Sequence, residues 1–463
     1  MRFSGQTQTA VRVPSAEEET ATRVARLAES FRSAKATVGV VGMGYVGQPL
    51  AITAHQKGFR VVGFDIDAAR VAALNNGKSS IGTIPDGKIG AMLRDRRFRA
   101  SNNLNELSNV DVVVICVPTP LNKYREPDLS HVRGTAESVS AALRPDQLVC
   151  LESTTYPGCT TEVLKPAMEV GGLKVGEDVF LAYSPEREDP GSNFRTSEIP
   201  KVVGADDPHS RILSEAFYGR LVDCIVPVAN TATAEAVKLS ENIFRCVNIA
   251  LVNELKHIFA HMGIDIWEVI EAAATKPFGY MPFYPGPGLG GHCVPIDPFY
   301  LSWKAREHEV PARFIELAGE INTAEPLEVV SSLASALSTR KQMSLNGSRI
   351  LLVGVAYKRN VDDLRESPAL TIFKQLEAKG AAVDYYDPWV RMIPETRDFP
   401  HLAGRRSVAW KPESFAEDFD AALIVTDHDS VDYQALANSL DLIVDTRNAL
   451  REVRGHAPNI VKA

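Results

Sequence analysis

The stretch Gly42-Met43-Gly44-Tyr45-Val46-Gly47 decides the fold of this 463-residue chain. The β-branched run Thr37–Val41 precedes it, and a helical pattern over residues 47–57 follows it. A second apolar run, Arg60–Phe64, ends in Asp65, which stands 23 positions after Gly42. A strand, a glycine-rich turn, a helix and a later acidic residue, in this order, form the fingerprint of a Rossmann unit. The sequence therefore predicts a βαβ unit that binds a dinucleotide.

The residues of this stretch have separate roles in such a unit. Gly42 forms the tight turn, Gly44 lets the backbone approach a pyrophosphate, and Gly47 allows the helix to pack closely on the strand. The amides at the start of the helix, next to Tyr45 and Val46, offer donors and partial positive charge to phosphates. We therefore expect all five residues to contact the cofactor.

Asp65 predicts which dinucleotide is bound. Its carboxylate would accept hydrogen bonds from ribose hydroxyls and would repel a 2′-phosphate, which favours NAD over NADP. Arg70 is a further candidate cofactor contact that could weaken this preference. The interpretation that we favour for Arg70 is an exposed arginine on the surface of a helix.

Two more polar segments stand where strands are expected to end. They are Val117-Pro118-Thr119-Pro120 and Glu152-Ser153-Thr154-Thr155. Ligands of open α/β sheets collect at the carboxyl ends of the strands. Either segment alone could equally be an ordinary turn, but the two together predict cofactor contacts from Thr119, Ser153 and Thr154.

The pattern of the whole chain predicts an α/β fold. Strands are expected at Thr37–Val41, Arg60–Phe64, Val110–Val117, Leu148–Leu151, Val179–Tyr183, residues 350–354, Ala382–Tyr386, Ala421–Val425 and Leu442–Val444. Residues 231–262 contain neither proline nor glycine and predict one long helix. The expected domains are an N-terminal extension with one helix capped by Ser15 (1–36), an N-terminal Rossmann-like domain (37–228), a central helical domain (229–330) and a smaller C-terminal Rossmann-like α/β domain (331–463).

Composition excludes several classes of function. A formal net charge of −8 argues against a nucleic-acid partner, which would favour a basic surface. Six cysteines without CxxC spacing are typical of reduced thiols in a cytosolic protein. The sequence shows neither a signal-peptide pattern nor a membrane-spanning apolar run. We expect a soluble, cytoplasmic protein without a metal site.

The loop Gly286-Pro-Gly-Leu-Gly-Gly-His-Cys-Val-Pro-Ile-Asp-Pro298 is a candidate centre of chemistry. Its four glycines and three prolines fix an irregular backbone around Cys293 and Asp297, and Gly290 allows a ligand to approach closely. Cys293 could attack a carbonyl as a thiolate, and Asp297 could activate water. A rigid connector with a buried cysteine is the alternative, and from this loop alone the two readings are evenly matched.

Three pairs of polar residues add candidate contacts. Lys238 and Asn242 are four positions apart in the long helix and share a face, where they could stabilise an oxyanion, although a solvated lysine is favoured from spacing alone. Glu186 and Arg187 follow a strand end, and Glu186 could orient or deprotonate a bound group.

Lys358 and Arg365 follow the first strand of the C-terminal domain. They could hold a diphosphate, with the arginine as a bidentate donor and the lysine as a point charge.

The motifs GMGYVG, CVPTP, ESTTYPG, SPER, KLSEN, GGHCVPID and GVAYK…DDLRES occur in this order between about Val38 and Asn448. This order resembles the UDP-glucose/GDP-mannose dehydrogenase family, the nucleotide-sugar 6-dehydrogenases. The stretch from Thr275 to Glu307 is similar to the members that act on UDP-N-acetylglucosamine in surface-polysaccharide pathways. The resemblance implies a homodimer or higher homo-oligomer built on the central helices.

The resemblance also implies a reaction. A C6 hydroxyl is oxidised to a carboxylate in two NAD-dependent steps, with Cys293 as the nucleophile that forms a thiohemiacetal and then a thioester. Lys238 and Asn242 match the oxyanion-holding pair, Asp297 the water-activating carboxylate and Thr154 a water-positioning hydroxyl. Glu186, Arg187, Gly290, Lys358 and Arg365 match substrate contacts.

The sequence departs from the UDP-glucose enzymes at two positions. Their second glutamate, four after the first, is Pro190, and their lysine before the aspartate is Ile296. These differences leave open the base of the first oxidation, and UDP-glucose or UDP-N-acetylmannosamine stay alternative substrates. A two-electron hydroxyacid-type dehydrogenase and a non-catalytic NAD sensor are the alternatives from other classes. The role of His292 stays open.

Overall fold

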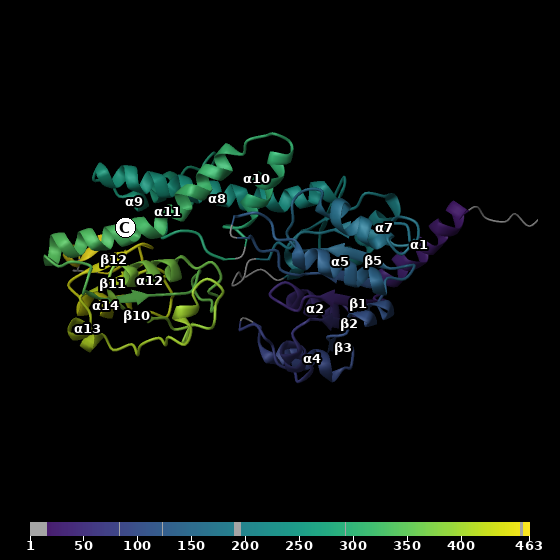
Figure 1. Ribbon diagram of the computed structural model, residues 1–463, viewed down its shortest axis with the longest axis horizontal. Helices are drawn as coiled ribbons and strands as arrows, with labels where there is room; N and C mark the ends of the chain where they lie inside the picture. The colour runs from purple at the N-terminus through teal and green to yellow at the C-terminus, as the bar shows by residue number, and fades with distance from the viewer. Residues whose placement is uncertain (1–15, 83, 123, 189–195, 292, 454–456) are drawn as a thin grey trace, which may run out of the picture. The chain divides into compact units, whose positions relative to one another are not determined.

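A computed structural model describes residues 16–82, 84–122, 124–188, 196–291, 293–453 and 457–463 (Figure 1). The chain forms two compact units. The first contains most residues up to Lys238, and the second contains Leu239–Ala463 with the short segment Pro120–Pro127. Ser15, the predicted helix cap, lies outside the described residues.

The first unit is built on one eight-stranded sheet, coloured purple to teal in Figure 1. Its strands are β1 (Thr37–Val41), β2 (Arg60–Phe64), β3 (Phe98–Ser101), β4 (Val112–Ile115), β5 (Leu148–Leu151), β6 (Phe180–Tyr183), β7 (Lys201–Gly204) and β8 (Ile225–Val228). Their order is β3-β2-β1-β4-β5-β6-β7-β8, and every neighbouring pair is parallel except β6 and β7. Apolar runs that are buried on both faces explain the parallel pairing, and the predicted α/β class is confirmed.

In the described part of this unit, seven α-helices accompany the sheet: α1 (Ala16–Arg32), α2 (Gly47–Gln56), α3 (Ala68–Asn75), α4 (Asp86–Arg94), α5 (Ser130–Ala142), α6 (Lys165–Glu169) and α7 (Pro208–Leu221). The apolar stripe of α1, formed by Val24, Ala28 and Phe31, is buried in the core of the unit. The rings of Phe31 and Phe217 meet edge to face at 6.3 Å, which fixes α1 against α7. A π-helical turn, Thr160–Leu164, precedes α6.

The helices α8 (Thr231–His261), which begins in the first unit, α9 (Ile266–Ala274), α10 (Asp297–Glu307) and α11 (Arg313–Ala336) precede the second sheet. The long helix predicted over residues 231–262 is confirmed as α8, whereas α11, which contains Pro326, was not predicted. Val329, Val330 and Leu333 of α11 are buried among the apolar residues of the C-terminal sheet. None of the helices in the described part of the chain is long and apolar enough to cross a bilayer.

The C-terminal sheet has five parallel strands in the order β10-β9-β11-β12-β13. The strands are β9 (Arg349–Val353), β10 (Ala382–Tyr386), β11 (Ala421–Ile424), β12 (Ile443–Asp445) and β13 (Ile460–Lys462), and the helices α12 (Pro368–Ala378), α13 (Pro412–Asp418) and α14 (Tyr433–Ser439) connect them. This second, smaller α/β sheet confirms the fold class expected for the end of the chain.

Candidate active site

The glycine turn after β1 has the geometry that a dinucleotide requires. Gly42 has φ +93°, and a Cβ there would lie 2.6 Å from the carbonyl oxygen of Cys116. A Cβ on Gly47 would lie 1.9 Å from the carbonyl oxygen of Gly42, whereas one on Gly44 would meet nothing within 4 Å. Gly42 and Gly47 are therefore required by the protein's own packing, and Gly44 leaves the backbone accessible to a pyrophosphate. Tyr45 and Val46 are half-buried beside it.

Asp65 lies at the carboxyl end of β2, next to this turn. Its Oδ2 accepts a hydrogen bond from the Met43 amide at 2.9 Å, and its Oδ1 accepts one from the Asp67 amide at 2.9 Å. Arg70 Nη1 donates to both carboxylate oxygens, at 3.0 and 2.9 Å. The sequence favours an exposed helix arginine, whereas Arg70 is half-buried, with 34% of its side chain exposed, and is paired with the candidate ribose ligand.

The ends of β4 and β5 bring the other expected cofactor contacts together. The Ser153 hydroxyl donates to the carbonyl oxygen of Val117 at 2.8 Å. Thr119 and Ser153 are buried, and Thr154 is half-buried at the same edge of the sheet. Because the carboxyl ends of adjacent parallel strands share one edge, these residues adjoin the glycine turn after β1.

A buried charge cluster, formed by Glu152, Lys201 and Glu186, lies beyond the end of β5. Lys201 Nζ is 2.9 Å from Glu152 Oε2 and 3.4 Å from Glu186 Oε2. The Tyr218 hydroxyl donates to Glu152 Oε1 at 2.8 Å. Burial opposes the charged form of Lys201, but Glu152 and Glu186 outweigh it and raise the pKa of its ammonium. Lys201 is consequently a permanent cation between two carboxylates, and sequence reasoning did not find it.

Glu186 is held as an anion. Its Oε1 accepts hydrogen bonds from the amides of Arg187 at 2.7 Å and Glu188 at 2.6 Å. Burial alone would raise the pKa of Glu186, but Lys201 and the Glu188 amide outweigh it and lower that pKa. Lys238 Nζ donates to the Glu186 carbonyl oxygen, which joins α8 to this segment and rules out the solvated-lysine interpretation. The side chain of Arg187 donates to the Pro200 carbonyl oxygen at 2.6 Å.

Glu188 has a different character from Glu186. Its Oε1 is buried and has no hydrogen-bond partner among the residues that the structure describes. Burial, followed by the charge of Glu186, raises the pKa of Glu188 to about 7. Glu188 can therefore exchange a proton near neutral pH, which Glu186 cannot do.

The thiols of the chain fall into two groups. Cys116, Cys150, Cys159 and Cys246 are buried, and burial raises the pKa of each thiol. Cys293 is half-buried and Cys224 is exposed. A thiol must be accessible and able to ionise to act as a nucleophile. The four buried thiols are therefore unsuited to that role.

Cys293 precedes α10 in the second unit, and Asp297 begins that helix. The amide of Asp297 donates to the Cys293 carbonyl oxygen at 2.8 Å, which fixes the spacing of the two residues. Asn242 Nδ2 donates to Asp297 Oδ2, and Arg245 donates to the Asn242 side-chain oxygen. Asn242 and Asp297 are both buried, and the helix N-terminus favours the negative charge of Asp297. Arg245 is a further member of this group that sequence reasoning missed.

The glycines of the Cys293 loop pack against the loop that follows β9. A Cβ on Gly290 would lie 2.6 Å from Tyr357 Cβ, and one on Gly291 would lie 2.8 Å from the Tyr357 ring. The Gly291 amide donates to the Arg365 carbonyl oxygen at 3.0 Å. The loops of Cys293 and of Lys358 and Arg365 are therefore in direct contact. His292 lies outside the described residues.

Lys358 and Arg365 are both half-buried. Arg365 already forms a bidentate pair with Asp363, with Nε–Oδ1 and Nη2–Oδ2 distances of 3.0 and 2.6 Å. A carboxylate that orients an arginine fixes its remaining donors without removing its charge.

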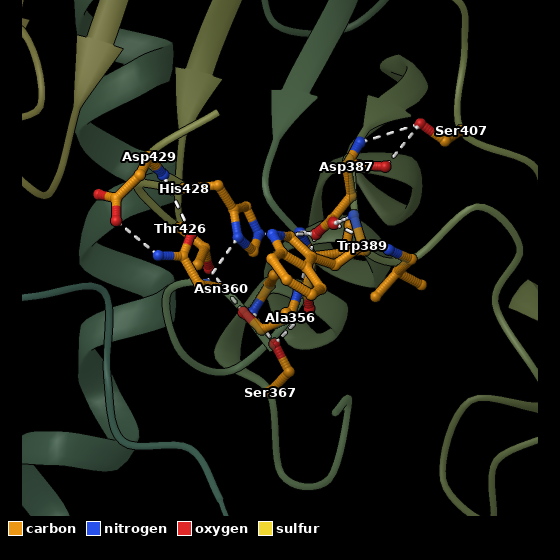
Figure 2. A network of polar contacts seen from close by, with 12 residues as sticks. Ala356, Asn360, Ser367, Asp387, Trp389, Ser407, Thr426, His428 and Asp429 are labelled. Carbon is orange, nitrogen blue, oxygen red and sulfur yellow. Dashed lines mark hydrogen bonds and ion pairs between the residues drawn. The ribbon is translucent and has the colours of Figure 1, made fainter. Parts of the chain in front are cut away.

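The turn after β9 has the same tight glycine geometry as the turn after β1, but the side chains next to it differ. Gly354 has φ +82°, and a Cβ there would lie 2.3 Å from the Thr426 carbonyl oxygen, as at Gly42. Asp387 follows β10 as Asp65 follows β2, but Asp387 is fully buried and bonded to His428 (Figure 2). The residues after Gly354 also lack the second and third glycines of the fingerprint. This turn is therefore closed to a dinucleotide.

Comparison with known proteins identifies the family. Residues 36–222 match the NAD binding domain of the UDP-glucose/GDP-mannose dehydrogenase family, residues 232–324 its central domain and residues 351–452 its UDP binding domain. The chain belongs to the UDP-glucose/GDP-mannose dehydrogenase family. It is thus an NAD-dependent nucleotide-sugar dehydrogenase, and the predicted cofactor NAD is confirmed.

Relatives in this family act on more than one sugar. The chain is 38% identical to the UDP-N-acetyl-D-glucosamine 6-dehydrogenase of Pseudomonas aeruginosa, over 76% of this chain and 83% of that protein. It is 32% identical to the UDP-N-acetyl-D-mannosamine dehydrogenase of Pyrococcus horikoshii, over 90% of this chain and 96% of that protein. The solved structure of a UDP-D-ManNAc dehydrogenase from that organism superimposes with a TM-score of 0.81, at 32% identity, covering 92% of this chain and 98% of that chain.

Proposed function

We propose that this dehydrogenase oxidises the C6 hydroxyl of UDP-N-acetylglucosamine to a carboxylate, as a step in making surface-polysaccharide precursors. The observation that carries the proposal is the group around Cys293. A half-buried thiol stands four residues before a buried carboxylate that is held by Asn242, in a loop whose glycines pack on the Lys358 loop. The named activity of the relative in Pseudomonas aeruginosa supports the choice of sugar.

The proposed chemistry requires a nucleophile and a water-activating carboxylate. When held by the glycine turn after β1, NAD would supply the hydride acceptor for each of the two oxidations. The Cys293 thiolate adds to the C6 aldehyde, and the oxyanion that forms is stabilised by Lys238 and Asn242. Loss of hydride from this thiohemiacetal leaves a thioester. Asp297 then takes a proton from water, which attacks the thioester and releases the carboxylate and the Cys293 thiol.

Glu188 is the base that we propose for the first oxidation. Glu186 is bound to two amides and lies near Lys201, so its carboxylate is committed to structure. Glu188 adjoins this cluster and presents a buried carboxylate oxygen without a partner in the described residues. A base with a pKa near the working pH is the most effective acceptor of a hydroxyl proton. Pro190 in place of the second family glutamate makes such a substitute necessary.

UDP-N-acetylmannosamine is the second candidate substrate, because the relative in Pyrococcus horikoshii has that named activity. A panel of UDP- and GDP-sugars, each assayed with NAD and with NADP, tests the proposal. We expect the highest kcat/KM with UDP-N-acetylglucosamine and NAD. A higher value with UDP-N-acetylmannosamine or UDP-glucose would contradict the proposed sugar. A hydroxyacid dehydrogenase or an NAD sensor would have no use for the UDP binding domain that residues 351–452 match.

Replacing Asp65 by serine is expected to raise the KM for NAD by about 10- to 100-fold, since hydrogen bonds to a charged group contribute about 1.5–3 kcal/mol. The same change releases Arg70 from its carboxylate, so discrimination against NADP should relax. Steady-state kinetics with both cofactors measure the two effects. The double variant Asp65→Ser/Arg70→Met should lose the improved use of NADP that Asp65→Ser alone is expected to gain. An unchanged preference for NAD in Asp65→Ser would place the ribose contact elsewhere.

We also propose that α8 contributes to a homodimer interface. Phe244, Leu251 and Ile258 are spaced seven residues apart along α8, and they are 49%, 49% and 43% exposed. Contiguous exposed apolar side chains mark surfaces that bind a partner.

Leu251→Glu is expected to shift the protein from dimer to monomer in sedimentation experiments, because two copies of a buried charge would face each other across the interface. Ala25→Glu adds the same charge to an exposed position of α1 and should leave the assembly unchanged. A dimer that survives Leu251→Glu at low protein concentration would exclude this face.

A further inference from the structure

The Asp387–His428 pair is buried at the carboxyl edge of the C-terminal sheet (Figure 2). Both side chains are fully buried, and His428 Nε2 lies 3.1 Å from Asp387 Oδ2. Asp387 follows β10, whereas His428 follows β11. The pair therefore joins two strand ends that flank β9 on opposite sides.

Asp387 is saturated by hydrogen bonds. Besides His428, its Oδ2 accepts from the amides of Val355 at 2.8 Å and Ala356 at 3.1 Å. Its Oδ1 accepts from the amides of Trp389 at 2.8 Å and Val390 at 2.9 Å. A carboxylate has about four lone-pair sites, so these five donors leave none for a ligand. Asp387 consequently acts on the loop after β9 and does not contact a nucleotide directly.

His428 anchors a second point of the same loop. Its Nδ1 lies 3.0 Å from the Asn360 amide nitrogen, which can only donate. Nδ1 is therefore the acceptor of this hydrogen bond, and Nε2 is the nitrogen that faces Asp387. Asn360 has φ +59°, a left-handed conformation that asparagine tolerates better than most residues. The loop turns at this position.

The two anchors enclose a three-residue segment. Val355 and Ala356 are fixed by Asp387, Asn360 is fixed by His428, and Tyr357, Lys358 and Arg359 lie between them. The Thr426 hydroxyl also donates to the Ala356 carbonyl oxygen at 2.6 Å. The outer side of the turn has further contacts: Arg359 pairs with Asp427, whose side chain is only 11% exposed, and Asn360 exchanges hydrogen bonds with Asp429 at 2.5 and 3.1 Å. The ion pair of Arg359 with Asp429 joins two exposed side chains and contributes little.

We propose that His428 is a positioning residue: paired with Asp387, it holds the loop after β9 so that Lys358 meets the diphosphate of the nucleotide sugar. The inference rests on the proposed function, together with the expectation from the sequence that Lys358 holds the diphosphate of the nucleotide sugar. Tyr357 packs on Gly290 and Gly291, and its amide donates to the Asp363 carbonyl oxygen at 3.0 Å.

His428→Gln and His428→Asn separate the two contacts of the ring. The glutamine amide reaches the place of Nε2 and can still donate to Asp387, but it leaves the Asn360 amide without an acceptor. The shorter asparagine places its oxygen near Nδ1 and keeps that acceptor. We expect His428→Gln to raise the KM for the UDP-sugar about tenfold, with kcat and the KM for NAD within twofold of wild type, and His428→Asn to have a smaller effect. An equal rise in the KM for the UDP-sugar in both variants would overturn the proposal. A fall in kcat together with a matching rise in the KM for NAD would also overturn it.

A double-mutant cycle with Lys358→Met tests whether His428 acts through Lys358. The double variant His428→Gln/Lys358→Met should have the same KM for the UDP-sugar as Lys358→Met alone. A KM raised by the product of the two single-variant fold-changes would overturn the inference. Calorimetric titration of each full-length variant with UDP gives the same comparison for any variant that has lost activity. If Lys358→Met itself leaves UDP binding unchanged, the expected contact of Lys358 with the diphosphate fails, while the proposed oxidation at Cys293 is untouched. In that case His428→Gln should also leave UDP binding unchanged, and weakened binding would show that His428 acts by another route.

Discussion

Replacing Cys293 by serine is expected to abolish uronate formation while NAD binding is retained. A serine hydroxyl does not ionise at neutral pH without an activating base, so the covalent adduct with the aldehyde should not form at a useful rate. We expect the overall rate to fall by about 10³-fold or more, as for other lost nucleophiles. Chromatographic analysis of the sugar products, together with fluorescence titration with NAD, measures both outcomes.

Cys224→Ser is the matched control for this substitution. Cys224 is exposed, and it follows α7 in the first unit, away from the Cys293 loop in the sequence. The same change of sulfur to oxygen at this position should leave the rate within about twofold of wild type, as surface substitutions usually do. Near-normal uronate production by Cys293→Ser would remove the covalent step from the mechanism.

Replacing Glu188 by glutamine is expected to slow alcohol oxidation by about 10²–10⁴-fold, the usual contribution of a general base. Oxidation of the synthetic C6 aldehyde should continue, because that step needs Cys293 and no proton acceptor for the hydroxyl. The wild-type enzyme should lose kcat/KM for the sugar as the pH falls through about 7, since Glu188 must be deprotonated to act. The groups that face Glu188 in this titration are Glu186, Lys201 and Glu152.

Two variants make the Glu188 experiment specific. Glu188→Asp should restore part of the alcohol oxidation with a shifted pH profile, because the carboxylate is kept. Glu177→Gln removes a carboxylate from an exposed pair with Lys174 and should leave both half-reactions unchanged. A Glu188→Gln variant that oxidised the alcohol at the wild-type rate, with an unchanged pH profile, would exclude Glu188 as the base.

Much of the fold follows from the sequence because its signals are local. Gly42, Gly47 and Asp65 occupy the places in the βαβ unit that their spacing predicts, and the bounds of β1, β2 and β5 agree to the residue. Strand β8 was missed because Pro227 breaks its short apolar run, and α11 was missed because Pro326 lies inside the helix. Tertiary packing overrides the local preference in both cases.

The candidate site was less completely predictable, since side-chain partners are set by tertiary contacts. Strand ends pointed to Asp65, Glu186 and Arg365, but no local pattern indicated that Arg70 or Asp363 would pair with them. Lys201 begins the short strand β7, which pairs antiparallel with β6 and breaks the βα alternation that guided the sequence reading. The apolar residues that follow Lys201 in the sequence are those of an ordinary core strand. Its position between two carboxylates is therefore visible only in the folded structure.

The number of NADH molecules formed per sugar consumed tests the central claim most directly. The covalent mechanism at Cys293 predicts two NADH for each UDP-N-acetylglucosamine converted to its uronate, measured by absorbance at limiting sugar with the product identified by mass. One NADH per sugar, with an aldehyde or ketone as the product, would contradict the four-electron mechanism, and no NADH would exclude oxidation of this sugar altogether.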